Sequence, residues 1–77
     1  MRELVLYIAQ SLVDFPDQVR VTERRHDHTV ILQLQVAPDD LGKVIGRQGR
    51  TARAMRTLLE TREDRRGARY ELEILED

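Results

Sequence analysis

With 77 residues, the chain is predicted to form one small domain over residues 1–77, in which folding buries little more than about 60% of the unfolded surface. The absence of cysteine excludes disulfides and thiolate metal sites, and 35% charged residues exclude a membrane-embedded chain. A net charge of −1 excludes a general polyanion binder, and the lack of a signal-peptide pattern predicts a cytoplasmic protein.

The first predicted element is an amphipathic helix over residues 2 to about 14. Leu4, Val5, Ile8 and Leu12 recur at helical spacing and are expected to face the core. Pro16 ends this helix, because the residue before a proline avoids the helical conformation.

Two strands are predicted next. Val19 and Val21 alternate with polar residues, which indicates a first strand. The strongest alternation follows at Val30, Leu32, Leu34 and Val36. Residues 25–28 lie between the two runs and are expected to form the turn of a hairpin, although they include no glycine.

Two helices and a third strand complete the chain. Pro38 suits the start of a short helix, and Asp39 and Asp40 would complement the positive end of its dipole. Gly46 would end this helix, and a second would run from about residue 50 to 62. The expected inward residues of the two helices are Leu41, Val44, Ile45, Ala52, Met55, Leu58 and Leu59. After a loop over residues 63–67, the last strand would present Tyr70, Leu72 and Ile74.

This order predicts an α+β fold with a three-stranded mixed sheet and all helices packed on one face. The first two strands would pair antiparallel, and the second and third would be parallel because two helices connect them. The open face would carry Gln33, Gln35, Glu71 and Glu73, whereas the aromatic residues Tyr7, Phe15 and Tyr70 are expected in the core.

Positive charge is concentrated around the segment from Gly46 to Gly49, which we call the glycine-framed turn. No Asp or Glu lies between residues 41 and 58, yet this segment holds five basic residues, and without them the chain would have a net charge of −6. Glycines let a backbone approach phosphate closely, and the following helix adds its positive end. The five residues are Lys43, Arg47, Arg50, Arg53 and Arg56.

The element order and the string from Gly42 to Arg56, with Gly46-Arg47-Gln48-Gly49 at its centre, resemble the KH domain of the prokaryotic type II topology. The string is similar to that of the small bacterial single-KH proteins of the KhpA type. Ala52 stands where KH domains generally have a larger aliphatic residue. The resemblance covers nearly the whole chain and implies the helix-strand-strand-helix-helix-strand order predicted above.

The resemblance implies binding of single-stranded RNA, with the GXXG loop on the backbone of about four nucleotides and the bases in an apolar groove. It implies a post-transcriptional regulator or RNA chaperone, and a homodimer or a heterodimer with a larger multidomain KH protein. Residues 62–66 match the variable loop, expected as the opposite wall of the groove, and Val36 is a further candidate for its floor. The expected RNA-binding residues are Lys43, Val44, Ile45, Gly46, Arg47, Gln48, Gly49, Arg50 and Arg53.

Two other functions remain open: a protein-interaction adaptor that uses the KH fold, and a regulator that binds a small nucleotide or phosphate. His26 and His28 make a poor metal site, because the only further ligand nearby is Asp27. No nucleophile and base are paired in the sequence, so we expect neither an enzyme nor a cofactor.

Overall fold

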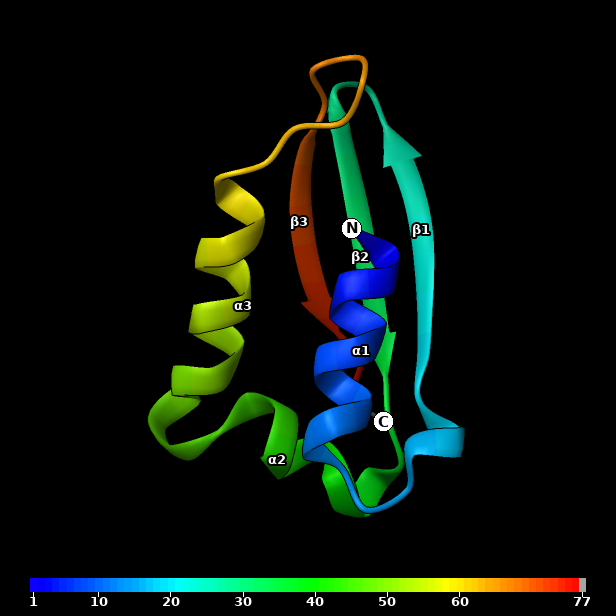
Figure 1. Cartoon of the computed structure of the whole chain (residues 1–77), viewed down its shortest axis with the longest axis vertical. Coiled ribbons are helices and arrows are strands. Elements are labelled where there is room, and N and C mark those ends of the chain that lie inside the picture. Colours follow the sequence, from blue (N-terminus) through cyan, green and yellow to red (C-terminus); the bar gives the residue numbers. More distant parts are fainter. Residues whose placement is uncertain (77) are drawn as a thin grey trace.

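The computed structural model describes residues 1–76 and has three helices and three strands (Figure 1). The elements are α1 (Arg2–Leu12), β1 (Arg20–His26), β2 (Thr29–Gln35), α2 (Leu41–Ile45), α3 (Arg50–Glu60) and β3 (Arg69–Ile74). Single 3-10 turns lie at Pro16–Gln18, Pro38–Asp40 and Arg47–Gly49. The predicted α+β fold and its element order are confirmed.

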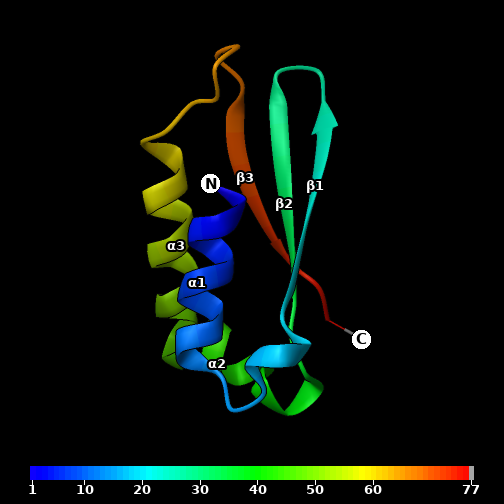
Figure 2. The same ribbon diagram turned by 45° about the vertical axis from the view of Figure 1, so that its right-hand side comes forward.

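The strands form one mixed sheet in the order β1-β2-β3. β1 and β2 are antiparallel, whereas β2 and β3 are parallel and are connected through α2 and α3. Figure 2 shows the three helices on one side of this sheet, as expected. On the other side, Gln33 donates to Glu73 (2.6 Å) and accepts from Arg24 (2.9 Å), so the open face is tied together by polar side chains.

The core lies between the sheet and the helices, and it corrects the predicted faces of two helices. In α1 the buried residues are Val5 and Ala9, whereas Leu4 and Leu12 are exposed. In α3, Leu58 is 46% exposed, because Ala52, Met55 and Leu59 occupy the inner face. Each helix buries only the residues on the side that packs against the sheet, so the neighbouring leucines remain outside.

Two aromatic residues also lie outside the core, contrary to the prediction. Tyr7 is 70% exposed and Phe15 is 45% exposed, whereas Tyr70 packs partly buried against the core. Tyr7 lies two residues from both Val5 and Ala9 along α1, so it points away from the sheet.

The hairpin turn is tighter than predicted. β1 extends to His26 and β2 begins at Thr29, which leaves Asp27 and His28 to reverse the chain. Asp27 has a φ of 54°, a conformation that aspartate tolerates better than most residues. Asp27 therefore takes the place of the glycine that such a turn usually contains.

The loop after α3 is closed by Asp64. Its carboxylate accepts hydrogen bonds from the backbone amides of Arg66 (2.8 Å) and Ala68 (2.7 Å) and pairs with Arg25 of β1. The Arg25 hydrogen bond, together with those amides, lowers the pKa of Asp64 to about 2. The loop is thereby fixed to the end of the hairpin.

This pKa predicts acid sensitivity. An aspartate in an unfolded chain titrates near ~3.9, so the stabilisation from Asp64 is complete above that pH and is lost as the pH falls through about 2. Urea unfolding at pH 7, 4, 3 and 2 should show that Asp64→Asn flattens the acid-induced loss of stability. An Asp64→Asn profile parallel to that of wild type would contradict the assignment.

None of the helices within residues 1–76 is long and apolar enough to cross a bilayer.

Candidate nucleic-acid interface

The glycine-framed turn links α2 to α3 at one corner of the molecule (Figure 1). Two backbone hydrogen bonds shape it: Gly46 donates to Gly42 (2.9 Å) and Gly49 donates to Gly46 (3.0 Å). Gly46, Gln48 and Gly49 all have positive φ, at 79°, 57° and 73°. The turn thus exposes a short stretch of backbone with both of its middle side chains, Arg47 and Gln48, facing solvent.

The first glycine is required by a close contact with α3. A Cβ atom at Gly46 would lie 2.3 Å from the Thr51 hydroxyl oxygen and 2.9 Å from the Thr51 backbone nitrogen. No heavy atom lies within 4 Å of the same position at Gly49. The structure therefore gives Thr51 a packing role beneath the turn.

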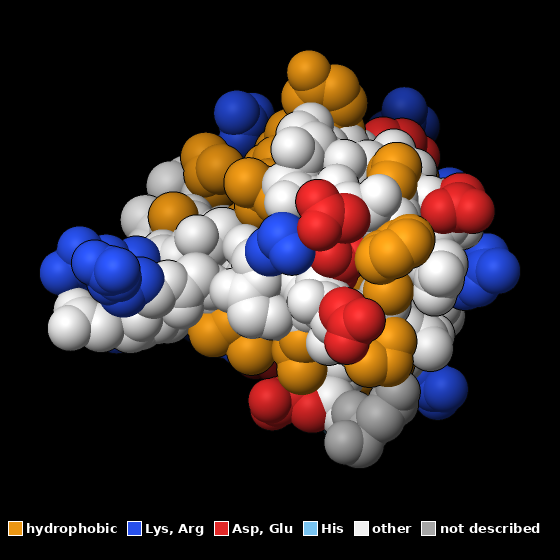
Figure 3. Space-filling view, turned by 90° about the horizontal axis from the view of Figure 1, so that it is seen from below, with side chains coloured by type: hydrophobic (Ala, Val, Ile, Leu, Met, Phe, Trp, Pro, Cys, Tyr) orange, Lys and Arg blue, Asp and Glu red, His pale blue; other side chains and the backbone are white. Residues whose placement is uncertain are grey.

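The arginines of the turn and of α3 are exposed and available. Arg47, Arg50, Arg53 and Arg56 are all exposed, and none makes an ion pair within residues 1–76. Arg50 donates to the Gln48 side chain (3.0 Å), which holds two polar groups of the turn together. Figure 3 shows basic side chains gathered at the projecting corner on the side where the α2–α3 turn lies.

A groove of about 420 Å³ begins at this turn and lies between α3 and the end of β3. Its apolar surface comes from Ile45, Ala52 and Ile74, and its charged lining consists of Arg53, Arg56 and Glu76. Ala52 is only 3% exposed, so it forms the bottom of this groove. Two expected floor residues do not line this groove: Val44 has no exposed surface and Val36 is 8% exposed, and both belong to the core.

A second groove, of about 660 Å³, continues along α3 and β3 toward the loop over residues 61–68. Arg62 and Glu63 line it, so part of the segment expected as the opposite wall does border the α3–β3 surface. Its charged lining is balanced, with three arginines and three glutamates: Arg56, Arg62, Arg69, Glu60, Glu63 and Glu71. The excess of positive charge along α3 and β3 therefore lies at the first groove, next to the glycine-framed turn.

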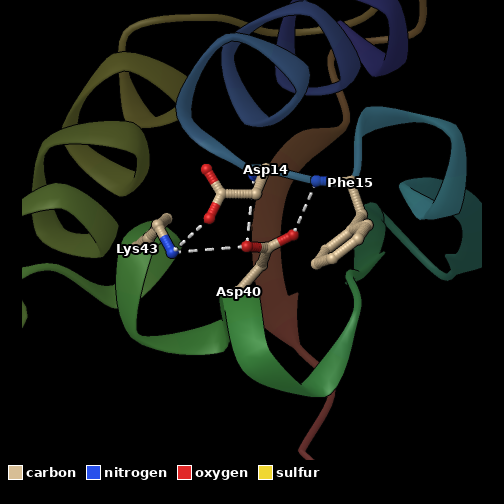
Figure 4. Close-up of polar contacts among 4 residues, drawn as sticks. All are labelled: Asp14, Phe15, Asp40 and Lys43. Atoms are coloured by element: carbon tan, nitrogen blue, oxygen red, sulfur yellow. Dashed lines mark hydrogen bonds and ion pairs between the residues drawn. The ribbon is translucent and has the colours of Figure 1, made fainter.

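Lys43 does not point freely to solvent. Its ammonium group lies 3.1 Å from the Asp14 carboxylate and 3.5 Å from the Asp40 carboxylate (Figure 4). The hydrogen bond to Asp14 raises the pKa of Lys43 above its ordinary value. Lys43 is thus occupied by contacts within the chain, which its position among other basic residues in the sequence did not reveal.

Asp40 is the residue that the sequence analysis missed. It was expected to complement the dipole of α2, yet its side chain makes no cap bond there and is fully buried. Its oxygens accept hydrogen bonds from the backbone amides of Asp14 (3.2 Å) and Phe15 (3.0 Å), just after α1. Burial raises the pKa of Asp40, but these amides and Lys43 outweigh it, and the pKa lies below its usual value.

Among residues 1–76, no three His, Cys, Asp or Glu side chains converge in a way that could hold a metal ion.

Comparison with known proteins places this chain in one family. The sequence profile described as "KhpA/KhpB, KH domain" matches residues 2–74. The chain is 47% identical to RNA-binding protein KhpA of Chlamydia pneumoniae, over 100% of this chain and 99% of the relative. It is 51% identical to that of Treponema pallidum (96% and 92%) and 50% identical to that of Aquifex aeolicus (99% and 96%). No solved structure matches the chain.

Proposed function

The chain belongs to the KhpA/KhpB family of KH domains, and on this basis we propose that it binds single-stranded RNA through the glycine-framed turn. The relatives named above are RNA-binding proteins, which supports RNA as the ligand. We propose further that binding serves post-transcriptional regulation or RNA chaperoning. A protein that binds single-stranded RNA can act in either role by changing the folding or the accessibility of that RNA.

The observation that carries this proposal is the juxtaposition of the turn, the unpaired arginines and the apolar groove. Gly49 leaves the backbone open to phosphate oxygens, because no heavy atom lies within 4 Å of its Cβ position, whereas Gly46 packs closely on Thr51 and shapes the turn. The exposed Arg47 and Gln48 reach the sugar-phosphate chain. Arg50 and Arg53 neutralise adjacent phosphates, with guanidinium groups suited to bidentate contact.

The bases would lie on the surface of Ile45, Ala52 and Ile74, beside the phosphate-binding arginines. The exposed aromatic residues are on other parts of the molecule: Tyr7 on α1 and Phe15 after it. Recognition would therefore use aliphatic contact and hydrogen bonds to base edges in place of aromatic stacking. Such contacts discriminate weakly, so we expect low sequence specificity.

Salt dependence provides a test. Each phosphate contact to a single strand contributes a slope of about −0.7 to the logarithmic plot of affinity against salt, so three arginines predict roughly −2. Fluorescence anisotropy of a labelled single-stranded RNA pool, titrated at several salt concentrations, measures this slope. A flat plot, or displacement of the RNA by a mononucleotide at comparable concentration, would contradict the proposal and favour a small-nucleotide site.

We propose that the chain also pairs, either with itself or with a larger protein that carries a KH domain. An exposed, largely apolar depression on α3, formed by Ala54, Thr57, Leu58 and Thr61 and bordered by Arg50 and Arg53, supports this proposal. Pairing would strengthen weak single-site binding by linking two sites. Sedimentation velocity should show an assembly that Leu58→Asp reduces to a monomer. This surface would be excluded if the wild type were a monomer at all concentrations and Leu58→Asp did not weaken binding to a KH-containing partner.

A further inference from the structure

We propose that Asp40 is a positioning residue for the RNA-binding turn and that Lys43 acts with it, within the protein, instead of contacting phosphate. This inference rests on the proposed function. It concerns a cluster of four residues that joins the end of α1 to the start of α2: Asp14, Phe15, Asp40 and Lys43 (Figure 4).

The burial of Asp40 is the first observation. Among residues 1–76, Asp40 is the only charged residue that is buried, and none of its surface is exposed. Removing a carboxylate from water is costly, and apolar residues of similar volume often serve stability as well or better. What a carboxylate provides that an apolar residue cannot is direction, because each of its oxygens is held by a particular donor.

The donors define that direction. One oxygen accepts from the Asp14 amide and the other from the Phe15 amide, which are 26 and 25 residues away in the sequence. Lys43 then bridges Asp40 to the Asp14 side chain. The first turn of α2 is therefore fixed to the segment after α1 from two sides, once through the backbone and once through side chains.

The proximity of this cluster to the turn is the second observation. α2 has five residues and ends where Gly46 begins the turn. The four-residue cluster therefore lies less than two helical turns, roughly 8 Å along the helix axis, from the phosphate-binding backbone. Val44 anchors the same helix in the core. Leu41 of the same helix also packs against the core. Without the contacts of Asp40, α2 would keep these apolar contacts but lose the directed bonds at its start, so it would be free to shift and would move Arg47 and Gln48 away from the groove.

The expected consequence is a loss of affinity without a loss of phosphate contacts. If the turn is correctly placed in only a fraction of the folded molecules, the apparent Kd rises by the inverse of that fraction. The salt slope stays the same, because the complex that forms still contains the same ion contacts. A residue that touches phosphate behaves differently, since its removal lowers the slope by about 0.7.

The test compares Asp40→Asn, Lys43→Met and Arg50→Met by RNA titration at several salt concentrations, each variant checked by circular dichroism. We expect Asp40→Asn to weaken binding about tenfold and Lys43→Met about threefold, both with the wild-type slope, and Arg50→Met to lower the slope. Val5→Ala, in the core of α1, is the control for a general loss of stability. At a temperature where it is fully folded, it should bind like wild type.

Amide hydrogen exchange adds a readout that global destabilisation does not mimic. In Asp40→Asn, exchange of the Gly46 and Gly49 amides should accelerate more than exchange in β2, whereas Val5→Ala should accelerate both alike. If Asp40→Asn does not fold, Lys43→Met, whose side chain is 44% exposed in the wild type, carries the test alone.

Two results would overturn the inference: a folded Asp40→Asn that binds RNA like wild type, or a Lys43→Met whose slope falls as in Arg50→Met. Absence of RNA binding by the wild type is a distinct result, which refutes the proposed function. The hydrogen-exchange comparison would then still show whether Asp40 fixes the position of the turn.

Discussion

Replacing Arg47 and Gln48 together with aspartate is expected to weaken RNA binding by at least about 50-fold, or more than ~2.3 kcal/mol. The change removes a cation and a neutral donor from the two exposed positions of the turn and places two negative charges where phosphate would bind. Lost charge-assisted hydrogen bonds and new repulsion both act against the complex. Fluorescence anisotropy with a single-stranded RNA pool measures the effect.

The fold should survive this change, because neither side chain is part of the core. Gln18→Asp/Arg20→Asp is a matched control, because it alters the net charge equally and at exposed positions. These positions belong to the segment from the end of α1 to the first residue of β1, which lies across the lower end of the molecule from the α2–α3 turn (Figure 1). The control should bind RNA with at most a small loss from long-range charge. If the turn variant binds RNA as well as the control does, the glycine-framed turn is not the RNA-binding site. The function would then be better explained as that of a protein-interaction adaptor.

Replacing Gly46 with alanine should cost the protein about 2–4 kcal/mol of unfolding free energy and most of its RNA affinity. The backbone at Gly46 has φ 79° and ψ 168°, a region that is essentially restricted to glycine. The added methyl group would also collide with Thr51, including its backbone nitrogen, which cannot move without displacing the start of α3. Urea unfolding monitored by circular dichroism measures the cost.

Gly49→Ala is the matched control for this prediction. Gly49 also has positive φ, but its Cβ position is open, so only the backbone strain of about 1 kcal/mol should appear. The two glycines of the same turn therefore predict clearly different losses of stability. Equal losses would show that the contact between Gly46 and Thr51 does not determine the geometry of the turn.

The order of elements was predictable from the sequence because the periodicity of the apolar residues is strong. The alternation at Val30, Leu32 and Leu34 specifies β2 and its inner face, and the two-helix connection fixes β3 as its parallel neighbour. The rotation of each helix was less predictable. Leu58 and Leu59 both suit a buried stripe by spacing, and the tertiary packing of Met55 and Ala52 decides that only Leu59 is buried.

The site was predictable only where it depends on local sequence. Two glycines three residues apart amid basic residues indicate the turn, and the structure places them there. The partners of Asp40 come from another part of the chain, so a buried carboxylate looked like a surface dipole complement. The ion pairs of Lys43 were not predictable for the same reason, because the acid nearest to its ammonium group, Asp14, lies outside the acid-free segment.

The most direct test of the central claim is an NMR titration of the ¹⁵N-labelled chain with a short single-stranded RNA. Binding at the glycine-framed turn predicts that the largest amide shifts fall on residues 45–53 and on the end of β3 at Ile74, with little change on the open face of the sheet. Shifts concentrated on that open face or on α1, or no saturable shifts at all, would contradict the claim.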